Sequence, residues 1–267
     1  MAIVPGLGSP PGEWDAVVEA LPASVAVLVV DPADGPPLRT PADWTPRAVA
    51  DRLAQRLDGA ARPVLLVGHS AGGLAVQALL HGDPEVAGAV LVDASHAHSV
   101  RPAPAALARA GRVLADLVLA TGIGTVLGPA LRRLGVRAGT VRRRDRLSPA
   151  AVRAVYASPA WARTTVDAWF GHATLQAGVL AWQAERGAPR PPVRLLVGAA
   201  GSGRGRARWI ALQRDLAVRL AAPPPRLLDD AGHLVALDRP DAVVEEIHAL
   251  LTGGASPPTR RSRRSDG

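Results

Sequence analysis

The chain has 267 residues, of which 48% are hydrophobic and 20% charged, and its formal net charge is +8. This apolar content supports one sizeable core and excludes a chain that is disordered throughout. Because the chain has no cysteine, it can form no disulfide, no Cys-ligated zinc site and no iron–sulfur cluster. Lysine is also absent, which excludes a lysine Schiff base and a P-loop lysine.

The positive charge is concentrated in two segments. Residues 101–153 contain eleven arginines against Asp116 and Asp145, and the residues after 251 contain four arginines against Asp266. The rest of the chain is mildly acidic. With one tyrosine and one phenylalanine, the sequence offers no aromatic platform for stacking bases, so we expect no nucleic-acid partner.

The sequence gives no sign of a targeting or membrane segment. Its first residues lack the basic region and long apolar run of a signal peptide. The longest uncharged apolar stretch, from Leu117 to Leu131, is shorter than the roughly 18 to 20 residues that span a bilayer. We therefore expect no integral membrane segment and a cytoplasmic location.

Strand and helix patterns alternate along most of the chain. Residues 2–4 resemble the stub of a strand, and continuous apolar runs predict strands over 25–31, 63–68, 89–93, 193–198 and 226–229. Helical patterns cover 46–57, 71–80, 209–220 and 240–251. Uninterrupted apolar strands that alternate with helices predict an α/β fold, an open and mostly parallel sheet flanked by helices.

One long segment interrupts this alternation. Residues 97–190 are rich in Ala, Leu, Val and Arg and have no strong strand signal, so we interpret them as an inserted helical cap. The core then comprises residues 1–96 and 191–252. Residues 253–267 are rich in Pro, Ser and Arg and are predicted to be a disordered basic tail.

A candidate nucleophile lies between the second full strand and its helix. Gly68-His69-Ser70-Ala71-Gly72 has the pattern G-x-S-x-G, whose small residues permit a sharp turn that lifts the serine hydroxyl above the sheet. The following helix N-terminus favours negative charge nearby. We predict that Ser70 is a nucleophile; the alternative is a glycine-rich turn with an idle serine.

A serine nucleophile needs a base, and His233 has the best position among the seven histidines. It follows the last predicted strand, so its loop should lie at the same carboxyl edge of the sheet as Ser70. His69, inside the turn, is expected to point away from Ser70. The pair His96 and His98 lacks a carboxylate at a regular spacing, so we expect no metal there.

The acid that would orient His233 is restricted by its place in the predicted sheet. The loop 198–204 after the fourth full strand contains no carboxylate, whereas Asp93 ends the strand next to the one before Ser70. Asp93 is therefore the predicted acid, although a strand-end aspartate also caps loops. Asp229 and Asp230 are expected to lie too near His233 along the chain to orient it.

Several segments together resemble the α/β-hydrolase superfamily. They are Gly68-His69-Ser70-Ala71-Gly72-Gly73, Val90-Leu91-Val92-Asp93-Ala94-Ser95-His96, Trp209 to Gln213, and Ala231-Gly232-His233 with Leu237-Asp238-Arg239-Pro240. The resemblance spans nearly the whole chain except the cap and tail. It implies an α/β-hydrolase fold and a triad in the order Ser70, Asp93, His233, in the branch whose acid follows the strand after the nucleophile helix. It also implies that no metal or organic cofactor is needed.

The segment Pro5-Gly6-Leu7-Gly8-Ser9 resembles the oxyanion loop of this superfamily, with Pro5 where a histidine is usual. The resemblance implies that the backbone N–H groups of Leu7 and Ala71 stabilise the oxyanion. A plain Gly/Pro turn is the alternative. The Ser at position 70, where dehalogenases and epoxide hydrolases of this fold have Asp, argues against those two chemistries.

The sequence therefore predicts a serine hydrolase that cleaves a small, hydrophobic carboxylic ester. Thioester or amide hydrolysis, acyl transfer, and a non-catalytic protein that binds a small ligand remain alternatives. A third hypothesis places the basic cap and tail on a membrane surface or an anionic partner. We expect instead that the cap residues Leu107, Leu114, Val118 and Leu131 are buried over the active site. Substrate identity and oligomeric state are left open.

Overall fold

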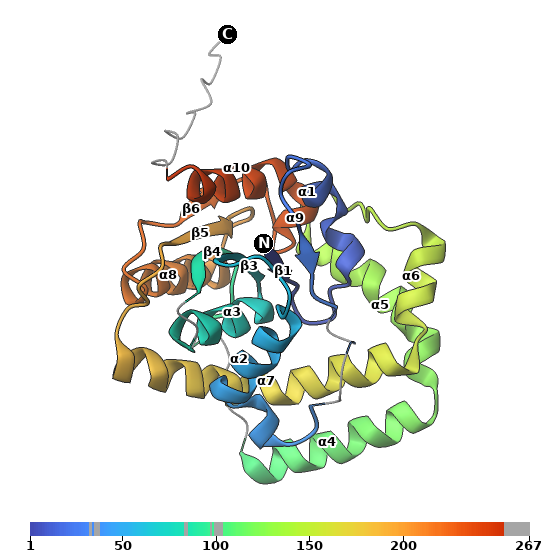
Figure 1. Ribbon diagram of the computed structural model, residues 1–267. Coiled ribbons are helices and arrows are strands. Elements are labelled where there is room, and N and C mark those ends of the chain that lie inside the picture. Colours follow the sequence, from blue (N-terminus) through green and yellow to red (C-terminus); the bar gives the residue numbers. More distant parts are fainter. Residues whose placement is uncertain (32–33, 35–37, 83–84, 97, 99–103, 254–267) are drawn as a thin grey trace.

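A six-stranded parallel sheet forms the centre of the molecule (Figure 1). The computed structural model describes residues 1–31, 34, 38–82, 85–96, 98 and 104–253. The strands are β1 (Ala2–Val4), β2 (Leu28–Val29), β3 (Val64–His69), β4 (Val86–Val92), β5 (Val193–Gly198) and β6 (Arg226–Leu228). Their order, β2-β1-β3-β4-β5-β6, confirms the predicted fold class.

The central strands follow directly from their continuous apolar runs. Every residue of β3 is buried, as are nearly all residues of β4 and β5, because helices cover both faces of the sheet. The prediction over 25–31 was wrong in length, since only Leu28–Val29 pairs as a strand. This segment is at the edge of the sheet, where it pairs with the three-residue β1 alone.

Two helical layers enclose the sheet (Figure 1). The helices of the core are η1 (Pro11–Trp14), α1 (Asp15–Glu19), η2 (Pro41–Trp44), α2 (Pro46–Arg56), α3 (Ala71–Gly82), α8 (Arg204–Arg219), α9 (Val235–Asp238) and α10 (Pro240–Leu251). Side chains of α2, α3 and α8 form one apolar cluster, and those of α1, α9 and α10 form the other around Trp14. Helix α8 begins at Arg204, earlier than predicted, because its first turn is arginine-rich and carries no apolar signal.

Four helices lie between β4 and β5, and we call them the cap helices. They are α4 (Ala105–Ala120), α5 (Ile123–Gly139), α6 (Pro149–Tyr156) and α7 (Pro159–Arg186). Leu175 and Val179 on α7 join the same apolar cluster as α2 and α3, so α7 is packed on the core. The domain limits at 97–190 and the basic tail stay predictions, because residues 97, 99–103 and 254–267 lie outside the described part.

A buried polar network ties the cap helices to the N-terminal segment. Arg132 on α5 forms ion pairs with Glu13 of η1 and, at 2.8 Å, with Asp145. Ser9 donates a hydrogen bond to Glu13 at 2.7 Å, and Tyr156 donates one to the carbonyl of Gly8 at 2.6 Å. Burial alone lowers the pKa of Arg132, but the hydrogen bonds and charges of Asp145 and Glu13 outweigh it and raise that pKa, so the guanidinium stays charged.

Within the part of the chain that the structure describes, no single helix has both the length and the apolarity to cross a membrane. Segments Ala106–Ala120 and Ile123–Gly139 meet the requirement only when taken together, and they are bent by 103° to one another.

Two neighbouring arginines test how much the buried network contributes to stability. Arg132→Ala leaves Glu13 buried without its ion pair, so we expect the free energy of unfolding to fall by about 3 to 5 kcal/mol. Arg133→Ala removes an exposed side chain one residue away and should change it by less than about 0.5 kcal/mol. Urea denaturation of both variants measures the difference; equal effects would show that the network does not anchor α5.

Candidate active site

Ser70 occupies a strained turn between β3 and α3. Its φ is +48°, a left-handed conformation that non-glycine residues rarely adopt. Two glycines make the close packing around this turn possible. A Cβ on Gly72 would lie 2.3 Å from the carbonyl oxygen of Val4, and one on Gly6 would lie 2.8 Å from Nδ1 of His69. The loop after β1 therefore lies directly against the turn that carries Ser70.

The structure brings together Ser70, His233 and Asp93 from three loops at the carboxyl edge of the sheet. Nε2 of His233 is 3.0 Å from Oγ of Ser70, and Nδ1 of His233 is 2.6 Å from Oδ2 of Asp93. Because a carboxylate only accepts hydrogen bonds, Nδ1 carries the proton, which leaves Nε2 free to accept the serine proton. Asp93 is fully buried, whereas His233 is 39% exposed.

Further donors hold the carboxylate of Asp93 in place. Its Oδ1 accepts a hydrogen bond from Nε1 of Trp209 at 2.8 Å and another from the backbone N–H of Gly198 at 3.2 Å. The ring of Trp209 also lies edge-on to that of His233, with centroids 6.2 Å apart. The role of Trp209 was not predicted, because a contact across 116 positions leaves no local signal in the sequence.

A second buried carboxylate fixes the loop that carries His233. Asp238 accepts hydrogen bonds from the backbone N–H of Gly232 at 2.8 Å and from those of Val141 at 2.9 Å and Arg142 at 3.1 Å. It therefore joins the His233 loop to the segment that follows α5. Asp238 belongs to a segment that resembles the α/β-hydrolase superfamily, but its contact with the segment after α5 was not predicted from the sequence.

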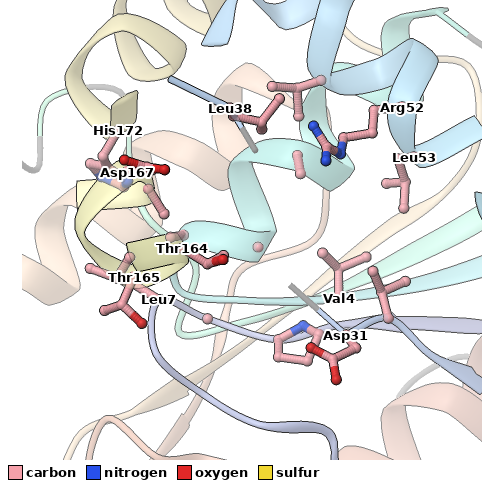
Figure 2. Close-up of a pocket in the computed structure, with 18 of the residues that line it drawn as sticks. Val4, Leu7, Asp31, Leu38, Arg52, Leu53, Thr164, Thr165, Asp167 and His172 are labelled. Atoms are coloured by element: carbon pink, nitrogen blue, oxygen red, sulfur yellow. The ribbon is translucent and has the colours of Figure 1, made fainter. Parts of the chain in front are cut away.

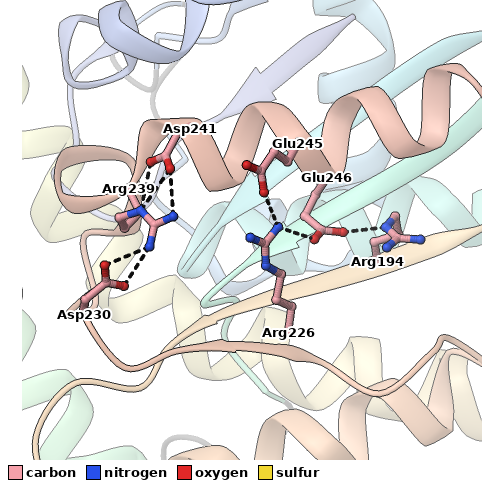
Figure 3. Close-up of polar contacts among 7 residues, drawn as sticks. All are labelled: Arg194, Arg226, Asp230, Arg239, Asp241, Glu245 and Glu246. Carbon is pink, nitrogen blue, oxygen red and sulfur yellow. Dashed lines mark hydrogen bonds and ion pairs between the residues drawn. The ribbon is translucent and has the colours of Figure 1, made fainter. Parts of the chain in front are cut away.

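Ion pairs also connect residues near this loop and on α10 to neighbouring segments (Figure 3). Arg239 lies between Asp230, at 2.8 Å, and Asp241, at 2.7 Å, and these hydrogen bonds raise the pKa of the Arg239 guanidinium. Glu246 on α10 accepts ion pairs from Arg194 and Arg226 on β5 and β6. Asp230 therefore pairs with Arg239, and the structure does not bring it to the ring of His233.

His69 is hydrogen-bonded to the loop that carries His233. Its side chain is buried, and Nε2 donates a hydrogen bond to the backbone carbonyl of His233 at 3.0 Å. Burial, followed by the charge of His233, lowers the pKa of His69 to about 4, so its imidazole is neutral at pH 7. Among the described residues, Ser70 is hydrogen-bonded through its hydroxyl to His233 and not to His69.

Two cavities meet at Ser70 and His233. The aliphatic cavity, about 710 Å³, is lined by α4, α5 and α7, with side chains that include Leu114, Val118, Leu119, Leu131 and Val136. The aromatic cavity, about 1240 Å³, is lined by side chains that include Trp169, Phe170, His172, Arg206 and Trp209. Leu7 lines both cavities, and Ala71 lines the aromatic one. Ser70 and His233 therefore line both cavities.

Leu7 lines both cavities together with Ser70, and Ala71 follows Ser70 directly in the chain. Ala71 is the first residue of α3, where an N–H group has no partner within the helix. Leu7 belongs to a turn closed by a hydrogen bond from Ser9 N–H to the Gly6 carbonyl at 3.1 Å. A smaller cavity of about 180 Å³ lies behind this turn and is lined by Leu7, Arg52, Asp167 and His172 (Figure 2). Neither Ser70 nor His233 lines it.

His96 is buried and engaged in hydrogen bonds that suit a structural role. Its Nε2 donates to Asp215 at 2.9 Å, and its Nδ1 accepts from the backbone N–H of His98 at 3.0 Å. Burial lowers the pKa of His96 despite the opposing effect of Asp215. In the described part of the chain, no three His, Asp or Glu side chains are grouped closely enough to hold a metal ion.

This fold and site agree with the comparisons with known proteins. Residues 2–246 match the family model described as "Alpha/beta hydrolase family", so the chain belongs to the α/β-hydrolase family. None of the curated proteins searched matches the chain.

Solved structures with the same fold differ widely from the chain in sequence. A thermophilic esterase from Thermogutta terrifontis with bound malate is 21% identical (TM-score 0.64), and the match covers 94% of this chain and 89% of the esterase. Epoxide hydrolase CorEH is 15% identical (TM-score 0.68), covering 94% and 90%. An alpha/beta hydrolase fold protein from Burkholderia ambifaria is 20% identical (TM-score 0.61), covering 92% and 88%. At these identities the likeness establishes the fold.

The lowered pKa of His69 makes a prediction about acid stability. Between pH 6.5 and 4 the unfolded chain binds a proton at this residue that the folded protein excludes, so stability falls as the pH falls. Relative to His69→Gln, the wild type should lose about 2 to 3 kcal/mol more unfolding free energy between pH 7 and pH 4.5. Urea denaturation at both pH values measures this loss. Parallel pH dependence in the two proteins would contradict the prediction, since the other histidines are common to both.

Proposed function

We propose that the protein is a serine hydrolase that cleaves carboxylic esters with an apolar acyl group. The observation that carries this proposal is the hydrogen-bonded series Asp93, His233 and Ser70 at the junction of two cavities. The hydroxyl of serine is a poor nucleophile alone, and a histidine whose tautomer is fixed by a carboxylate is the arrangement that activates it.

In the proposed reaction, Oγ of Ser70 attacks the ester carbonyl carbon while Nε2 of His233 takes the hydroxyl proton. Asp93 keeps Nδ1 protonated and stabilises the imidazolium. The N–H groups of Leu7 and Ala71 stabilise the tetrahedral oxyanion. As the C–O bond to the alcohol breaks, His233 gives its proton to the leaving oxygen, and an acyl-enzyme remains. Water then attacks the acyl carbon with His233 as base, which releases the carboxylic acid and restores Ser70.

The cavities support an assignment of the two ester substituents. The aliphatic cavity is lined mainly by apolar side chains of the cap helices, which suits an acyl chain. The aromatic cavity contains Arg206 and Ser202 and can take a more polar alcohol. Thioester hydrolysis, amide hydrolysis and acyl transfer use the same three residues and remain alternatives, as does ligand binding without catalysis. A cytoplasmic location stays a prediction from the sequence.

A fluorophosphonate probe tests the nucleophile directly, with intact mass as the readout. We expect one label on the wild type and none on Ser70→Ala. Asp93→Asn should label about 10³- to 10⁴-fold more slowly, because the wrong tautomer of His233 faces Ser70. Asp230→Asn is the matched control, since Asp230 is exposed and pairs with Arg239, and it should label at the wild-type rate.

If a folded wild type takes no label, the protein is not an active serine hydrolase and the ligand-binding alternative gains support. Equal slowing in Asp93→Asn and Asp230→Asn would instead remove Asp93 from the proposed mechanism.

Trp209→Phe tests whether the hydrogen bond to Asp93 positions the proposed acid. The variant keeps an aromatic ring but removes the Nε1 donor to a buried carboxylate. We expect kcat to fall about 10- to 100-fold, with KM for a soluble p-nitrophenyl ester little changed, because hydrogen bonds to charged groups are worth about 1.5 to 3 kcal/mol. A rise in KM alone would indicate that Trp209 contacts substrate and does not position Asp93.

A further inference from the structure

Helix α4 presents an apolar face to solvent. The side chains of Leu107, Val113, Leu114, Leu117 and Val118 are 42% to 64% exposed. Leu117 is four residues after Val113 and three after Leu114, Val118 is four after Leu114, and Leu107 is seven residues before Leu114, which places all five on one side of the helix. The cap residues Leu107, Leu114, Val118 and Leu131 line the cavities at Ser70, but the expectation that they are buried over the active site was wrong, since they are 42% to 64% exposed.

Helix α5 continues this apolar face after a bend of 103°. Its exposed apolar side chains are Ile123, Val126, Leu127, Leu131 and Leu134, with exposed fractions from 47% to 76%. We call the exposed apolar residues of the two helices the α4–α5 face. Ten large apolar side chains exposed on two consecutive helices are unusual for a soluble monomer, and such exposure marks an interaction site.

Three charged side chains of these two helices form ion pairs with other parts of the chain. Arg112 and Asp116 are both on α4. Arg112 forms an ion pair with Asp167 on α7, and Asp116 forms one with Arg163, which is also on α7. Arg132 on α5 is buried against Glu13 and Asp145. A helix on a soluble protein normally turns its apolar side inward, so the orientation here is reversed. Rotating either helix to bury the apolar face would break these ion pairs.

The charges around the α4–α5 face identify its occupant. Arg109 on α4 and Arg133 and Arg137 on α5 are exposed at its margin, and the exposed run Arg142 to Arg144 follows α5. A second copy of the chain would bring two sets of these arginines together, which electrostatic repulsion opposes. An anionic lipid surface offers both acyl chains for the apolar residues and phosphates for the arginines.

We propose that the α4–α5 face docks on an anionic lipid surface. Leu114, Val118 and Leu131 belong to this face and also line the aliphatic cavity that reaches Ser70. Docking therefore places the cavity opening against the lipid, so that an apolar ester can pass from the lipid to Ser70. This last step rests on the proposed function, whereas docking itself does not.

Vesicle co-sedimentation tests docking with the full chain in a Ser70→Ala background. The vesicles are phosphatidylcholine alone or with phosphatidylglycerol. The test variant combines Leu117→Ser, Val126→Ser and Leu134→Ser, three exposed positions that line none of the three cavities. The matched control is Val218→Ser on α8, an exposed apolar side chain outside the cap helices.

We expect binding to the anionic vesicles that weakens in high salt. The triple variant should bind about tenfold or more weakly, because insertion of apolar side chains supplies much of the affinity. Val218→Ser should bind like its parent. The triple variant should keep the circular dichroism spectrum and the cooperative urea denaturation of its parent, which shows that it is folded whether or not the protein is a hydrolase.

Three results would overturn the proposal. One is the absence of binding to anionic vesicles, and another is equal binding by the triple variant. The third is a parent protein that sediments as a dimer while the triple variant is a monomer, which would make a second copy the occupant. Replacing Arg260, Arg261, Arg263 and Arg264 by Gln separates any contribution of the tail. Because binding is measured without hydrolysis, failure of docking and failure of the proposed hydrolase activity are distinguishable.

Discussion

The buried carboxylate of Asp93 is the point on which the candidate site depends. A charge removed from water is costly unless hydrogen bonds replace its hydration. Here β5, α8 and the loop after β6 each supply a donor, through Gly198, Trp209 and His233. Since these donors come from separate parts of the chain, the three elements must be correctly placed at once. The same contacts that satisfy the charge therefore orient His233 toward Ser70.

The residues at the centre of this arrangement, Ser70, Asp93 and His233, could be proposed as candidates from the sequence. Ser70 could be predicted because a glycine-flanked serine between a buried strand and a helix is a local signal. Asp93 and His233 could be predicted because parallel strands bring their carboxyl ends to one edge, so that chain order alone restricts the candidates. The absence of a carboxylate after β5 then left Asp93 as the best acid. None of these inferences required knowledge of a distant contact.

What could not be predicted depends on pairs far apart in the chain. Arg132 meets Glu13 across 119 positions, and Asp238 meets Val141 across 97, so neither contact leaves a periodic signal. The orientation of α4 was missed for the same reason. Its apolar periodicity indicated which residues share a face, but the acidic and basic partners on α7 determine that this face turns outward. The length of the strand predicted over 25–31 was overestimated, because a hydrophobic run does not by itself show where a strand ends.

The buried carboxylates of Glu13 and Asp238 hold some parts of the cap helices in place and leave others free to vary in sequence. Helix α5 is fixed at its middle through Arg132, and the segment after it is fixed through Asp238, so substitutions there disturb the N-terminal turn and the His233 loop. Helix α4 is joined to α7 by the ion pairs of Arg112 and Asp116, while Leu114 and Val118 line the cavity and Leu117 is exposed. Evolution and protein engineering can therefore diversify α4 at little structural cost, making it the natural segment in which to alter substrate choice.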